Sequence, residues 1–136
     1  AGTAGTLAGV GSYLQDHVPG VQIVGVQPTA DSLSFVPDAK ATIDGVVRFD
    51  KPEGCTHPFV VRRNFKYDEV IDVQGEDAYA TAREVAASDG VFLGASAAAA
   101  LTAAKELALR PENEGKNIVV ILADNGMKYL STNMYK

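Results

Sequence analysis

The 136-residue sequence has no tryptophan, a single cysteine and no excess of basic residues. Because Cys55 stands alone, an intramolecular disulfide is impossible, and nothing indicates an oxidising compartment, so we expect a cytoplasmic location. A formal net charge of −5 leaves no overall basic surface to neutralise a phosphate backbone, which argues against nucleic acid as a partner. No uninterrupted apolar stretch approaches the roughly 20 residues that span a bilayer, so no membrane partner is expected.

Hydrophobic periodicity predicts helices that alternate with strands. Apolar residues at helical spacing predict three helices, at residues 6–18, 76–88 and 96–109. Short runs rich in Val, Ile and Leu predict strands at residues 21–26, 69–73, 91–93 and 117–122. Between the first two strands, the proline- and glycine-containing residues 29–68 form the most irregular stretch. This order predicts an α/β fold with a mostly parallel sheet flanked by helices.

A glycine-rich loop with two threonines, Gly2-Thr3-Ala4-Gly5-Thr6, leads into the first predicted helix. Its glycines allow backbone conformations closed to other residues, so that successive amides and two hydroxyls can converge on one anion at the positive end of the helix. The pattern predicts a phosphate site; the alternative is a helix entry whose threonines merely cap. Neither nucleotide motif holds, because a Walker lysine is absent and Leu14 stands where the dinucleotide fingerprint needs glycine.

The loop is similar to the Gly-Thr-Gly-Gly-Thr phosphate loop of cysteine synthases (O-acetylserine sulfhydrylases), with Ala4 in place of a glycine. Further segments resemble those of the same family in the same order, at residues 6–11, 23–26, 68–71, 94–96, 110–113, 118–122 and 129–132. The chain therefore resembles the cysteine synthase and cystathionine β-synthase family of fold-type II pyridoxal-phosphate (PLP) enzymes, whose fold is tryptophan synthase β-like. The resemblance implies that residues 1–136 form the C-terminal, phosphate-binding region of the large domain of a larger two-domain enzyme.

The resemblance also implies which residues hold the cofactor. Gly2, Thr3, Ala4, Gly5 and Thr6 would bind the PLP phosphate, with Ala4 contributing only its amide. Ser96, in Gly94-Ala95-Ser96-Ala97-Ala98, matches the serine that hydrogen-bonds the pyridine nitrogen in the family. A neutral hydroxyl there keeps the ring a moderate electron sink, which suits expulsion of a β-substituent. The alternative is that Ser96 is an ordinary helix N-cap.

Several segments depart from the family. Residues 43–47 fit the family's Gly-Ile-Gly stretch only loosely, and residues 48–66 differ throughout, which leaves substrate choice open. Within the second segment, Arg62 or Arg63 could pair with a carboxylate, although a solvated loop is the alternative. Cys55 and His57 lack further ligands, so no metal is predicted. Near the end of the chain, Asn125 stands where a small polar residue is normal near the cofactor ring, and Asp124 is either a turn residue or part of the site.

The lysine that forms the family's Schiff base with PLP precedes the phosphate loop, and no lysine here lies in a matching motif. We therefore expect that a missing N-terminal part of the enzyme supplies it, that this chain alone is inactive, and that the complete enzyme is a homodimer. The implied reaction is β-replacement on a small amino-acid substrate, an O-acetylserine-like serine, with sulfide to give cysteine. Alternatives are cystathionine β-synthase activity on serine and homocysteine, synthesis of another β-substituted alanine, or a non-catalytic phosphate- or peptide-binding module.

Overall fold

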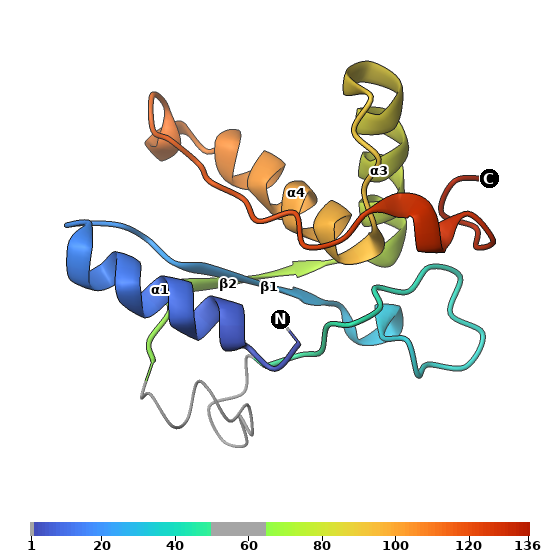
Figure 1. Ribbon diagram of the computed structural model, residues 1–136, viewed down its shortest axis with the longest axis horizontal. Coiled ribbons are helices and arrows are strands. Elements are labelled where there is room, and N and C mark those ends of the chain that lie inside the picture. The colour runs from blue at the N-terminus through green and yellow to red at the C-terminus, as the bar shows by residue number, and fades with distance from the viewer. Residues whose placement is uncertain (1, 50–64) are drawn as a thin grey trace.

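The computed structural model describes residues 2–49 and 65–136, which form an α/β arrangement around two parallel strands (Figure 1). The elements, in chain order, are α1 (Gly5–His17), β1 (Val24–Pro28), η1 (Ala30–Ser32), β2 (Glu69–Val73), α3 (Gly75–Asp89), α4 (Ala95–Ala108), η2 (Pro111–Asn113) and η3 (Gly126–Tyr129). Strands β1 and β2 pair from Val24 with Glu69 to Pro28 with Val73. No helix in the described ranges is long and apolar enough to cross a membrane.

The two strands separate two apolar clusters, because successive side chains of a strand point to opposite faces. Val24 and Val26 face the larger cluster, which is built on α3 and α4. On the other face, Ile23 packs with α1 in a smaller cluster that also contains Ala8 and Phe65. Helices therefore cover both faces of the sheet, with α1 opposite α4 (Figure 1), as the predicted α/β class requires.

The three helices lie within about one residue of their sequence-predicted bounds because their end signals are local. Helix α3 ends at Gly90, whose left-handed backbone (φ 69°) closes the last turn. Helix α4 ends before Pro111, which opens η2. Among the strands, β2 has the predicted bounds, whereas β1 begins three residues later than predicted and continues through Pro28.

Two predicted strands are not strands in the described structure. Residues 91–93 form only an isolated antiparallel bridge, between Leu93 and Asn125. Residues 117–122 pair with no described strand, and the Val119 side chain is 90% exposed. A strand needs a neighbouring backbone to bind its amides and carbonyls, and the described residues supply none there. The parallel sheet of the prediction is present, with two strands among the described residues.

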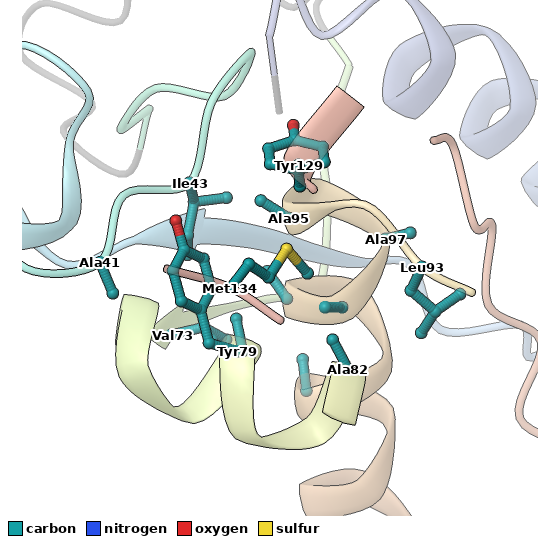
Figure 2. Close-up of a cluster of buried hydrophobic side chains, with 14 of the residues drawn as sticks. Ala41, Ile43, Val73, Tyr79, Ala82, Leu93, Ala95, Ala97, Tyr129 and Met134 are labelled. Carbon is teal, nitrogen blue, oxygen red and sulfur yellow. The ribbon is translucent and has the colours of Figure 1, made fainter. Parts of the chain in front are cut away.

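The larger cluster joins residues that are far apart in the sequence. It packs the buried alanine face of α4 against α3, β2 and two segments outside the helices, and Figure 2 shows Ile43, Ala95 and Tyr129 next to one another within it. Met134, near the end of the chain, is fully buried in the same cluster. The segment around Ile43 and the segment that contains η3 are thereby fixed beside the N-terminus of α4.

Candidate functional site

Four segments meet near the N-termini of α1 and α4. Gly2 lies against Gly45, since a Cβ added at Gly2 would be 2.8 Å from the carbonyl oxygen of Gly45. Asp44 in turn lies near enough to Tyr129 for its charge to influence the pKa of that phenol. The Tyr129 hydroxyl donates to Asp124, which contacts the first turn of α4. The sequence-predicted phosphate loop and Ser96 therefore belong to one continuous arrangement.

The phosphate loop ends in an N-terminus of α1 that no described side chain caps. Its N-cap residue, Ala4, is in the left-handed conformation (φ 61°), which costs a residue other than glycine about 1–2 kcal/mol. Such a conformation at the entry of a helix turns successive amides toward one point. The loop thus keeps the backbone geometry that a glycine would adopt more readily.

The donors of this loop are accessible. The first turn of α1 contains no acidic residue, and among the described residues the one hydrogen bond of a loop hydroxyl is long, 3.4 Å from the Gly5 amide to Thr3 Oγ1. Thr3 and Thr6 are both exposed, and the Thr6 hydroxyl has no hydrogen-bond partner among the described residues. An uncapped helix N-terminus attracts anions through its free N–H groups and its dipole. The residues present therefore fit a phosphate group such as that of PLP.

At the N-terminus of α4, the N-cap residue is Gly94, which has no side chain with which to cap. The amide of Ala97 instead donates to Asp124 Oδ1 over 2.8 Å. Ser96 is half-buried in this turn, and no described residue hydrogen-bonds its hydroxyl. The interpretation of Ser96 as the N-cap is therefore wrong, and its hydroxyl is available to another group.

Asp124 holds this turn through three contacts. Besides Oδ1 on Ala97, its Oδ2 accepts from the Tyr129 hydroxyl at 3.1 Å and its carbonyl accepts from the Gly94 amide at 3.2 Å. Burial, followed by the negative charge of Asp124, raises the pKa of Tyr129, so the phenol stays protonated and donates. Asp124 is thus more than the turn residue that was one of its two sequence interpretations. Its bond to Ala97 was not predicted, because the two residues are 27 positions apart.

Neighbouring contacts complete this part of the site. Asn125 Oδ1 accepts from the Met127 amide and caps η3, while its side chain remains exposed. The Tyr135 hydroxyl donates to the Leu93 carbonyl at 2.6 Å, and burial raises the pKa of that phenol. These bonds tie the residues before α4 to the end of the chain.

The segment that departs most from the resembled family lies largely outside the described residues, and this includes Cys55, His57, Arg62 and Arg63. At its start, Arg48 donates to the Pro28 carbonyl and pairs with Asp72 at 3.0 Å, which anchors it on the two strands. Within residues 2–49 and 65–136, no three His, Cys, Asp or Glu side chains are grouped to hold a metal ion.

Comparisons with known proteins agree with this geometry. A profile of the family described as "Pyridoxal-phosphate dependent enzyme" matches residues 1–124. The chain is 35% identical to the cysteine synthase of Aquifex aeolicus over 136 residues, which cover 98% of this chain and 38% of that protein. It is 33% identical to a probable cysteine synthase of Bacillus subtilis, covering 99% of this chain and 41% of that protein.

Solved structures give the same relationship. A cysteine synthase of Entamoeba histolytica superposes with a TM-score of 0.76 at 36% identity, over 99% of this chain and 38% of that chain. An O-acetylserine dependent cystathionine β-synthase of Helicobacter pylori superposes with a TM-score of 0.78 at 30% identity, over 100% of this chain and 42% of that chain. The chain thus spans about two fifths of the length of these relatives.

Proposed function

The chain belongs to the family of pyridoxal-phosphate dependent enzymes, and on this basis we propose that it is the phosphate-binding region of a cysteine synthase-like enzyme. The observation that carries the proposal is the uncapped N-terminus of α1, with exposed Thr3 and Thr6 hydroxyls and no acidic residue in its first turn. The amides of residues 2–6 and these two hydroxyls bind the PLP phosphate. The positive end of the helix dipole adds to the attraction.

Ser96 serves the other end of the cofactor in this proposal. Its hydroxyl has no described partner and lies in the first turn of α4, within the arrangement that contains the phosphate loop. It donates a hydrogen bond to the pyridine nitrogen and leaves that nitrogen unprotonated. PLP, when bound, withdraws electrons from the α-carbon of an amino-acid substrate, and a neutral serine keeps that withdrawal moderate.

The proposed substrate is an O-acetylserine-like amino acid whose β-substituent is replaced by sulfide to give cysteine. Similarity to the O-acetylserine dependent cystathionine β-synthase of Helicobacter pylori favours a second candidate, in which a larger thiol replaces sulfide. Gly45 lies against Gly2 of the phosphate loop, and this contact supports the proposal that residues 43–45 are where the two activities would differ. We propose that the Schiff-base lysine comes from a segment other than these residues.

The test compares PLP with pyridoxal, which lacks the phosphate. Thr6→Val removes a hydroxyl while nearly keeping the shape of the side chain, and one lost charge-assisted hydrogen bond is worth about 1–3 kcal/mol. We expect a PLP dissociation constant raised about 5- to 150-fold, with little change for pyridoxal. The protein is assayed together with the polypeptide that supplies the lysine, and the chain alone, which we propose to be inactive, is the control.

Thr102→Val is the matched control variant. The Thr102 hydroxyl donates to the Ala98 carbonyl within α4, away from the phosphate loop, so its loss should not distinguish the two cofactor forms. Equal losses for PLP and pyridoxal in Thr6→Val would show that the loop does not bind the phosphate. Binding of PLP without β-replacement on any O-activated serine would instead favour a non-catalytic phosphate-binding module.

A further inference from the structure

The first turn of α4 has no local means of fixing its own orientation. Its N-cap residue is Gly94, no residue in the turn is acidic, and the side chains around Ser96 are single methyl groups. A helix terminus without a capping side chain leaves its amides unsatisfied and frays. The geometry of Ser96 therefore depends on contacts from elsewhere in the chain.

Asp124 supplies those contacts on both sides of Ser96. Its carboxylate accepts from the amide of Ala97, the residue after Ser96, at 2.8 Å, and its carbonyl accepts from the amide of Gly94, two residues before, at 3.2 Å. The carboxylate lies directly against Gly94, since a Cβ added there would be 2.2 Å from Oδ2. The turn that carries Ser96 is thus held between two bonds from one residue.

Tyr129 fixes the direction of the carboxylate itself. Its hydroxyl donates to Asp124 Oδ2 at 3.1 Å, and the ring is 2% exposed in the larger cluster beside Ile43 and Ala95 (Figure 2). A negative charge is also favoured at a helix N-terminus by the dipole. The Asp124 carboxylate is therefore held in one position, and the first turn of α4, which it binds, is held with it.

We propose that Asp124 is a positioning residue for Ser96, holding the first turn of α4 so that the Ser96 hydroxyl meets the cofactor ring. This inference rests on the role of Ser96 in the proposed function. In this inference Asp124 acts indirectly, through the two hydrogen bonds that its carboxylate oxygens accept within the chain. Its removal should therefore change kcat through the position of Ser96.

A double-mutant cycle tests this dependence in the assembled protein. Asp124→Ala should lower kcat about 2- to 12-fold, the range for one net hydrogen bond, and change the KM for the amino-acid substrate little. It should also shift the absorption maximum of bound PLP in the direction seen for Ser96→Ala. In the Ser96→Ala background, Asp124→Ala should cause no further change in kcat or in the spectrum.

Two further variants support the cycle. Asp124→Asn keeps an oxygen that can accept from Ala97 and should recover most of the lost kcat. Tyr129→Phe leaves the bond from Ala97 to Asp124 in place but removes the donor to Oδ2, so it should give a smaller loss of kcat. That loss should again disappear in the Ser96→Ala background. If Asp124→Ala does not fold, Tyr129→Phe takes its place in the cycle. Faster hydrogen exchange at the Ala97 amide in Asp124→Ala provides a readout that is independent of activity.

The outcomes separate the inference from the proposed function. If the losses from Asp124→Ala and Ser96→Ala multiply, Asp124 acts on general stability and the positioning role is overturned, while the role of Ser96 stands. If Ser96→Ala changes neither kcat nor the spectrum, the proposed role of Ser96 fails and the positioning role falls with it. Equal losses of PLP and pyridoxal binding in Thr6→Val would overturn the role of the phosphate loop and leave the positioning role of Asp124 standing.

Discussion

Replacing Gly94 with alanine should destabilise the protein, although its backbone suits alanine. Gly94 has φ −83° and ψ 175°, an ordinary extended conformation, where removing a glycine normally stabilises a protein by about 0.4–1 kcal/mol through the unfolded state. The added Cβ, however, would be 2.2 Å from Oδ2 and 2.3 Å from Cγ of Asp124. The carboxylate is held by two hydrogen bonds and cannot move without breaking them.

The expected magnitude follows from the bonds that are lost. Losing the cap on Ala97 costs about 1 kcal/mol. Leaving the buried Tyr129 hydroxyl without its acceptor costs about 1–3 kcal/mol. After the gain of up to about 1 kcal/mol from removing a glycine, Gly94→Ala should lower the free energy of unfolding by about 2 kcal/mol.

Urea unfolding monitored by circular dichroism measures this change, with Gly9→Ala as the matched control. Gly9 lies inside α1 with nothing within 4 Å of an added Cβ, so alanine there should raise stability by about 1 kcal/mol. The same chemical change should thus have opposite signs at two positions. The reasoning fails if Gly94→Ala is as stable as the wild type, or if its loss persists undiminished in an Asp124→Ala background.

Two predictions concern the dependence of stability on pH. Burial and Asp124 raise the pKa of Tyr129 above its ordinary value of 10.0. Its contribution to the free energy of unfolding is therefore complete below pH 10. It is lost as the pH rises further, because the unfolded chain releases the phenol proton first. Tyr129→Phe should flatten the alkaline fall in the melting temperature; a fall of unchanged steepness would contradict this assignment. Hydrogen bonds from Arg110 at 2.7 and 2.8 Å lower the pKa of Glu69 from 4.5, so its contribution is present above pH 4.5 and is lost as the pH falls through the lowered pKa. Glu69→Gln should therefore melt earlier than the wild type at pH 7, with the two melting curves converging in acid.

The helices could be predicted from the sequence because what defines them is close by in the chain. Leu7, Leu14 and their neighbours repeat at helical spacing, and Gly90 and Pro111 end their helices locally. Residues 69–73 were equally clear, as a short β-branched run between the irregular residues 29–68 and the next predicted helix. In the site, the glycine-rich loop at the start of α1 could be identified for the same reason.

The rest depended on pairs that no local pattern contains. Strand β1 begins at Val24 because its pairing starts opposite Glu69, while the preceding Ile23 amide donates to the Asp68 carboxylate at 2.7 Å. Residues 117–122 have the composition of a buried strand, but pairing needs a second backbone, which composition cannot report. The cap that Asp124 provides for Ala97 is likewise invisible in sequence, because Ser96 itself is the residue that helix-cap statistics favour.

The buried face of α4 consists of alanines at positions 95, 97, 98, 99 and 103. Alanine has no side-chain rotamers, so burying this face on folding loses almost no side-chain conformational entropy. Because alanine side chains are short, few of them interlock with neighbouring side chains to fix the position of α4 along its own axis. Polar contacts with other elements therefore help to fix that coordinate: Asp124 at the first turn, Thr81 of α3 on Thr102, and Glu69 of β2 on Arg110 after the last turn. The depth of Ser96 in the site therefore depends on contacts along the whole length of the helix as well as on those of its own turn.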